Sequence, residues 1–135
     1  MFSYDRKSSP DFVESGVEYR NGISICDISF AGESQEKIKA YLVMPSGSGP
    51  FAGAVFLHPG LGSRSTFLDE ALILAEKGAA SLLIEAPWAD GPAFGMRASG
   101  KPEDVREWFI QIAIDLRRAI DLISSIPSVD KERIA

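Results

Sequence analysis

The sequence has little of several features that would assign a protein to a class at once. Its 135 residues contain a single cysteine, Cys26, so no disulfide can form within the chain. No apolar run approaches the roughly 20 residues that a membrane-spanning helix needs. The first residues are polar and lack the apolar core of a secretory signal. From these absences we expect a protein of the cytoplasm that has no membrane partner.

Positive charge is also scarce. The chain carries 14 Lys and Arg against 19 Asp and Glu, which gives a formal net charge of −5, and the basic residues form no cluster. Because binding to nucleic acid depends on concentrated positive charge facing the phosphates, we expect no nucleic-acid partner. With 45% hydrophobic and 24% charged residues, the composition is that of globular protein.

Histidine and cysteine, which often carry catalysis or bind metals, are also scarce. His58 is the only histidine, and no cluster of His, Cys and Asp accompanies it, so we expect no metal and no cofactor. No serine stands in a G-x-S-x-G frame, because the nearest frames, around Ser24 and Ser34, lack the second glycine. The chain therefore shows no nucleophile that His58 would serve as a general base.

The centre of the sequence has the pattern of a strand, a glycine-containing loop, a helix and a second strand. The apolar runs Phe51–Leu57 and Ala79–Ile84 are typical of strands that are covered on both faces. Between them, apolar residues at helical spacing from Thr66 onward predict a helix that ends at Gly78. A right-handed crossover of this kind places the loop 58–65 at the carboxyl edge of a parallel sheet, where such sheets bind ligands.

The flanking segments complete an α/β pattern. Residues 1–16 have no clear period, and we expect them to form a polar lead-in. Residues 17–50 alternate apolar with polar positions on either side of a turn, which predicts an antiparallel hairpin. Residues 51–135 form the parallel β/α part, in which a long helix begins at Pro102 and Ile134 opens a further strand.

Three stretches of this pattern resemble a known family. They are Val55–Gly62 (VFLHPGLG), Asp115–Leu122 (DLRRAIDL) and Val129–Ala135 (VDKERIA). Together with the order of elements, they resemble the α/β-hydrolase fold, and within it the dienelactone hydrolase-like esterases, acetyl xylan esterases and prolyl oligopeptidase-type catalytic domains. The resemblance implies an incomplete α/β-hydrolase domain. In this domain, an antiparallel hairpin precedes a parallel β-α-β-α unit, and the chain ends before the strand that carries the nucleophile elbow.

The resemblance also implies a function. The complete protein would be a serine-type hydrolase of small-molecule carboxylic esters, and this chain would supply its oxyanion loop but not its nucleophile, acid or base. In similar hydrolases a backbone N–H after the third strand stabilises the oxyanion, and here that group would be the N–H of Leu61. Gly60 and Gly62 would allow the backbone to approach the substrate closely, and His58 would support the loop by hydrogen bonding. Both glycines would also suit a plain strand-to-helix turn.

Further expectations follow for the substrate pocket and for the isolated chain. Trp88, Phe94 and Glu85 lie in or beside the long loop that follows the second apolar run, and they would line the pocket. A role in covering the core would equally explain Trp88 and Phe94. Exposure to solvent would equally explain the carboxylate of Glu85. Without the missing half, we expect the chain to be inactive and to self-associate through open strand edges.

Two other functions fit parts of the sequence. Gly60–Ser65 (GLGSRS) matches the dinucleotide fingerprint except that Ser65 replaces its third glycine. Glu85 stands about where an acidic residue would bind a ribose in that fold. A noncatalytic interaction domain is the other alternative. Titration with a nicotinamide cofactor distinguishes the first alternative from the rest.

Overall fold

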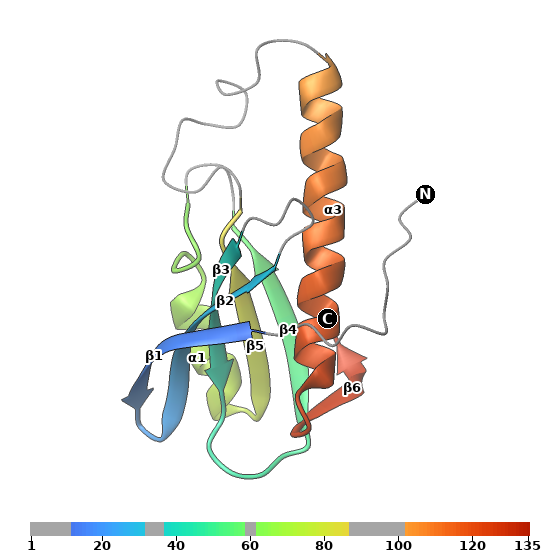
Figure 1. The fold of residues 1–135 in the computed structure, drawn as a ribbon. Coiled ribbons are helices and arrows are strands. Elements are labelled where there is room, and N and C mark those ends of the chain that lie inside the picture. Colours follow the sequence, from blue (N-terminus) through green and yellow to red (C-terminus); the bar gives the residue numbers. More distant parts are fainter. Residues whose placement is uncertain (1–11, 32–36, 59–61, 87–101) are drawn as a thin grey trace.

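The computed structural model describes residues 12–31, 37–58, 62–86 and 102–135 (Figure 1). In chain order these ranges contain β1 (Phe12–Arg20), β2 (Ile23–Ala31), β3 (Lys37–Met44), β4 (Phe51–Leu57), α1 (Leu68–Glu76), β5 (Ala79–Ile84), α3 (Pro102–Ser125) and β6 (Val129–Ile134). The strands form one sheet in the order β1-β2-β3-β5-β4-β6. The first three strands and β5 pair antiparallel, whereas β5, β4 and β6 run parallel. The architecture is therefore α/β, as the sequence predicted.

The helices α1 and α3 cover opposite faces of the sheet (Figure 1). Ala71 of α1 is buried together with Leu83 of β5, whereas Leu122 of α3 is buried together with Leu82. Leu82 and Leu83 are neighbours in one strand, so their side chains point to opposite faces. Both side chains are at most 1% exposed. The run Ala79–Ile84 is thus a strand covered on both faces, as predicted.

Strand β4 is less covered than its sequence predicted. Phe51 and Gly53 are buried, but the residues from Ala54 to Leu57 are only half-buried. The reason lies in the placement of the helices, because α1 packs mainly on β5, β3 and β2. The face of β4 on the α1 side is covered in part by Phe67, whose ring centroid lies 5.6 Å from that of Phe56.

The N-terminal part has one more strand than the sequence predicted. β1 begins at Phe12, so residues 12–16 belong to the sheet and not to a polar lead-in, and β1, β2 and β3 form an antiparallel meander instead of a hairpin. Every residue of β1 is exposed, so neither of its faces imposes a hydrophobic pattern. A register shift between Glu14 and Gly16 also interrupts the alternation on which strand prediction depends. Residues 1–11 lie outside the described part.

Strand β6 pairs with β4, and it starts earlier than the sequence predicted. It begins at Val129 instead of Ile134, and its middle residues are mostly exposed. Phe51 pairs with Val129 and Gly53 pairs with Ile134, so the stretch between the two contacts bulges away from β4. Beyond that stretch, the N–H of Ala135 donates to Gly53 O at 2.9 Å. The residues just before Ile134 are polar, so the sequence pattern did not indicate where this strand starts.

Both helices have the predicted positions. The helix α1 starts two residues after Thr66 and is followed by Gly78, whose φ of +88° favours glycine. The helix α3 starts at Pro102. Within the described ranges, no helix combines the length and the apolar character that crossing a membrane requires.

Gly53 lies where β4, α3 and β6 approach each other, and replacing it should destabilise the fold. A Cβ atom at this position would lie 3.2 Å from Val129 Cγ1 and 3.3 Å from Ile123 Cδ1 and Ile134 Cγ1. Overpacking of a core costs about 1–3 kcal/mol, which exceeds the roughly 0.4–1 kcal/mol that Gly→Ala gains by restricting the unfolded chain. We therefore expect Gly53→Ala to lower the free energy of unfolding, measured by urea denaturation.

Gly16 offers a matched control for this change. A Cβ atom at this strand position would meet no atom within 4 Å. Gly16→Ala should therefore leave the free energy of unfolding unchanged or raise it slightly. Equal effects of the two substitutions would show that the close approach at Gly53 carries no cost.

Candidate functional site

The carboxyl ends of β4 and β5 lie side by side. The two strands are parallel, and Leu57 is paired with Ile84, so the chain leaves both strands at the same level of the sheet. His58 follows β4 directly, and Ala86 follows β5 after one intervening residue. This is the edge at which the sequence placed the oxyanion loop. Gly60 and Leu61, the centre of that predicted loop, lie outside the described residues.

His58 joins the two loops that start at this edge. Its side chain is 3% exposed, and its Nε2 accepts a hydrogen bond of 2.9 Å from the backbone N–H of Ala86. Because Nε2 is the acceptor, a neutral ring carries its proton on Nδ1. The bond connects the residue after β4 to the segment after β5. That His58 supports an oxyanion site stays a prediction.

Gly62 is held in a space that excludes a larger residue. A Cβ atom on Gly62 would collide with Thr66 Oγ1 and would lie 3.3 Å from both Cβ and Nδ1 of His58. Thr66 is itself engaged, because its Oγ1 accepts a hydrogen bond of 2.9 Å from the N–H of Ser63. The absence of a side chain at Gly62 thus allows the loop to pack closely against Thr66 and His58.

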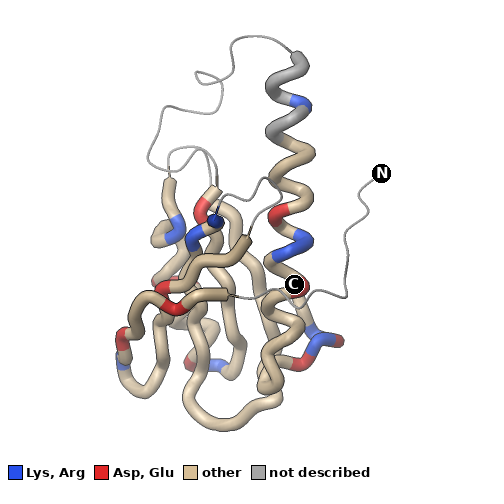
Figure 2. The backbone as a smooth tube through the Cα atoms, viewed as in Figure 1, with Lys and Arg blue, Asp and Glu red and all other residues tan. Residues whose placement is uncertain are grey.

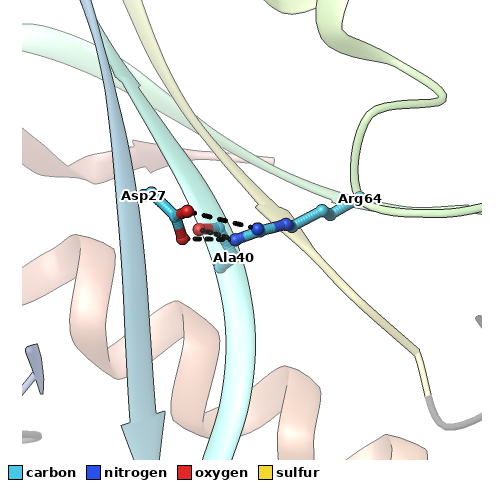
Figure 3. Close-up of polar contacts among 3 residues, drawn as sticks. All are labelled: Asp27, Ala40 and Arg64. Carbon is cyan, nitrogen blue, oxygen red and sulfur yellow. Dashed lines mark hydrogen bonds and ion pairs between the residues drawn. The ribbon is translucent and has the colours of Figure 1, made fainter. Parts of the chain in front are cut away.

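Arg64 connects the same loop to strands β2 and β3 (Figure 3). Its Nη1 donates to Asp27 Oδ1 at 2.6 Å and to the carbonyl oxygen of Ala40 at 3.1 Å, and its Nη2 donates to Asp27 Oδ2 at 3.3 Å. The guanidinium carbon also lies 4.0 Å from the ring centroid of Tyr41. Asp27 and Tyr41 are direct partners across β2 and β3. One side chain therefore binds a carboxylate, a carbonyl and an aromatic ring at once.

The charge of Arg64 is stabilised by its surroundings. Burial lowers the pKa of Arg64, but the hydrogen bond to Asp27 and the interactions with Tyr41, Asp27 and Glu85 together raise it above its ordinary value. The guanidinium is therefore charged throughout the pH range in which proteins are folded. Sequence analysis missed this cluster, because Arg64 and Asp27 are 37 residues apart and no local pattern links them.

Of the three predicted pocket residues, Glu85 alone lies among the described residues. It is half-buried, and its backbone N–H donates to the carbonyl oxygen of Lys39 at 2.8 Å. Glu85 follows β5 directly and therefore lies at the same edge of the sheet as the loop after β4. Its negative charge contributes to the raised pKa of Arg64. Trp88 and Phe94 lie outside the described residues.

Charged groups elsewhere are mixed in sign. In the part of the chain that the structure describes, Lys and Arg positions are interspersed with Asp and Glu positions along the backbone (Figure 2). No group of three or more His, Cys, Asp or Glu in those ranges could hold a metal ion.

The segment that leads into α1 differs from the turn that precedes a dinucleotide-binding helix. In the fingerprint, the glycine-rich turn leads directly into the helix, whose N-terminus binds the pyrophosphate. Here Ser65 lies in a turn, and α1 starts only at Leu68. Asp69 and Glu70 occupy its first turn, and their negative charges oppose a phosphate there. These features weigh against the dinucleotide alternative.

The contact between Gly62 and Thr66 can be measured as a coupling. Gly62→Ala should lower the free energy of unfolding by about 1–3 kcal/mol, because the new methyl group overlaps the Thr66 hydroxyl. Thr66→Ala alone loses one hydrogen bond, at a cost of about 0.5–1.5 kcal/mol. The double variant removes the overlap, so it should cost less than the sum of the single variants by about 1 kcal/mol or more. Additive losses in urea denaturation would contradict this packing.

Comparison with known proteins finds matches only among solved structures. No protein-family model matches the chain, and no curated protein matches its sequence. An acetyl xylan esterase from a Paenibacillus species is 24% identical with a TM-score of 0.74, and the match covers 95% of this chain and 45% of that one. Acetyl xylan esterase 1 from a Thermoanaerobacterium species is 17% identical with a TM-score of 0.74, covering 96% and 44%.

A third match extends the likeness to another hydrolase. A dienelactone hydrolase-like promiscuous phosphotriesterase from metagenomic libraries is 19% identical with a TM-score of 0.60, covering 84% of this chain and 48% of that one. In all three comparisons the chain spans less than half the length of the matched protein. The match with these hydrolases and the order of the strands agree with the resemblance seen in the sequence. The chain therefore has the α/β-hydrolase fold of these enzymes, over less than half of their length.

Proposed function

We propose that these residues belong to a serine-type hydrolase of small-molecule carboxylic esters and that they supply its oxyanion loop. One observation carries the proposal: His58 and Gly62 are packed against each other at the carboxyl edge of the parallel strands, in a fold shared with esterases. These two residues flank residues 59–61, from which the backbone donor would come. The N–H of Leu61 remains our candidate for that donor, and Gly60 would give it room.

The proposed chemistry is electrostatic stabilisation of a tetrahedral intermediate. A backbone N–H aimed at the developing oxyanion contributes about 3–4 kcal/mol when it is held in place before the reaction begins. The bonds from Ala86 to His58 and from Ser63 to Thr66 fix the chain on both sides of the proposed donor. The loop would therefore need little rearrangement when the charge develops.

The remaining catalytic groups would come from other residues of the complete protein. His58 is buried and its Nε2 is already an acceptor, so it is not positioned to take a proton from a nucleophile. No serine of this chain lies in a nucleophile-elbow sequence. Two of the similar structures are named acetyl xylan esterases, which supports an ester with a short acyl group as substrate. Trp88, Phe94 and Glu85 are proposed to line the pocket, and the cytoplasmic location stays a prediction.

Labelling with a fluorophosphonate tests the proposed function. We expect the protein expressed from the complete reading frame to label at one serine within a G-x-S-x-G sequence and to hydrolyse p-nitrophenyl acetate. The 135 residues alone should do neither above a heat-denatured control, because they contain no activated nucleophile.

Either of two results would refute this proposal. The first is stoichiometric labelling of a serine within the 135 residues. The second is a reading frame that stops directly after the codon for Ala135, because no nucleophile elbow would then follow.

The isolated chain is also proposed to self-associate. Phe109 and Ile120 of α3 are 59% and 42% exposed, and β6 is the last strand in the order of the sheet. Exposed apolar side chains and an unpaired strand edge each favour contact between copies. We expect the 135 residues to elute from size-exclusion chromatography as oligomers, and the protein from the complete reading frame to elute at one defined size. A monodisperse monomer of the isolated chain with a sharp thermal transition would contradict this.

A further inference from the structure

We infer that Arg64 is a positioning residue that holds the loop after β4 in the geometry required for oxyanion binding, with Asp27 and Tyr41 as its anchor. This inference rests on the proposed function, because the position of the loop affects catalysis only if the loop binds the oxyanion. Nothing in the sequence pattern or in the family resemblance pointed to this residue.

The geometry around Arg64 leaves its guanidinium group little freedom. Two of its nitrogens bind the two carboxylate oxygens of Asp27, and one of them also binds the carbonyl of Ala40. The ring of Tyr41 lies against the same group. A paired, stacked guanidinium is fixed in both position and orientation, which a lysine ammonium cannot reproduce.

The anchor lies on strands other than the one that the loop follows. Asp27 and Ala40 belong to β2 and β3, which are antiparallel strands, whereas the loop connects the parallel strand β4 to α1. The loop is thus attached at its start by the bond between His58 and Ala86, and near its end by Arg64. The loop after β5 is attached to the same strand, because Glu85 N–H donates to the carbonyl of Lys39, the neighbour of Ala40.

Burial of the arginine distinguishes this ion pair from an ordinary surface pair. The side chain of Arg64 is 15% exposed and that of Asp27 is 43% exposed, whereas the side chains of Arg20 and Glu18, which form another pair, are 46% and 60% exposed. Solvent and salt screen an exposed pair, so such pairs contribute little that can be measured. The Arg20 pair also spans only two residues of one strand, and it therefore fixes no loop.

Loss of the anchor should reduce turnover more than substrate affinity. A displacement of a catalytic group by about 1 Å lowers the rate by about 100-fold, even when the change lies away from the reacting atoms. The oxyanion exists only in the transition state and the intermediate, so a displaced donor lowers kcat and leaves ground-state binding largely intact. Loss of a residue with only a structural role would not lower kcat while leaving KM nearly unchanged.

The test uses variants of the protein expressed from the complete reading frame. Arg64→Met keeps an unbranched side chain but removes the charge, the donors and the guanidinium group that lies over Tyr41. We expect it to lower kcat for p-nitrophenyl acetate by about 10- to 100-fold with little change in KM, and to weaken inhibition by a boronic acid, which mimics the tetrahedral intermediate, by a similar factor. Asp27→Asn should act in the same direction, and Arg64→Lys should lie between Arg64→Met and the parent protein. Arg20→Met is the matched control and should leave kcat unchanged.

Amide hydrogen exchange measures the anchor without using activity. In Arg64→Met, the amides of Ser63 and Ala86 should exchange about 10-fold faster or more, because their hydrogen bonds belong to the released loops. The amides of Ile28 and Leu42, within β2 and β3, should keep their rates. Faster exchange at all four amides would indicate general destabilisation and would overturn the inference.

The remaining outcomes separate the inference from the proposed function. An active parent whose Arg64→Met variant retains kcat would overturn the inference and leave the proposed function standing. A parent that neither labels with a fluorophosphonate nor hydrolyses the ester would refute the proposed function and the catalytic part of the inference with it. Unchanged exchange at Ser63 and Ala86 would refute the anchor in either case.

Discussion

The parallel pairing of β4 with β5 is the constraint on which the candidate site depends. Because Leu57 and Ile84 are paired, the two strands end at the same level, and the chain has to leave both at one edge. With this register, the Ala86 N–H donates a hydrogen bond to His58 Nε2 across the two strand ends. The register in turn requires α1 to carry the chain back along the sheet, and the burial of Ala71 and Ala75 against β3 and β5 stabilises that crossover.

A second constraint follows from the polar chemistry of the loop after β4. A loop that packs closely on a sheet has to satisfy its polar groups within the protein. The part-buried Arg64 is matched by a carboxylate and a carbonyl. These two partners belong to strands β2 and β3, so the antiparallel part of the sheet contributes to the order of the site as well as to the core. The two parts of the fold are therefore connected through side chains as well as through the β3–β5 pairing.

The sequence predicted those features of the fold that depend on burial. The apolar run of β5, the end of α1 near Gly78 and the start of α3 at Pro102 all appear where the pattern placed them. It did not predict the start of β1, because that strand is exposed on both faces and interrupted by a bulge. Periodicity reports which face of an element is covered, and an element without a covered face produces no period.

The candidate site was predictable to a smaller extent, for a related reason. His58 and Gly62 were recognised because the strand and its glycine-containing loop are contiguous in the sequence. The anchor of Arg64 depends on an antiparallel register between β2 and β3 that brings Asp27 next to Tyr41. That register is a long-range property, and in this chain no residue type near Arg64 indicates it.

Both edge strands of the described sheet carry an irregularity. In β1, the extra residue between Glu14 and Gly16 breaks the regular spacing of backbone donors and acceptors. In β6, the register shifts between the pairing of Phe51 with Val129 and that of Gly53 with Ile134. An added strand could therefore pair regularly only with the stretches on either side of each irregularity.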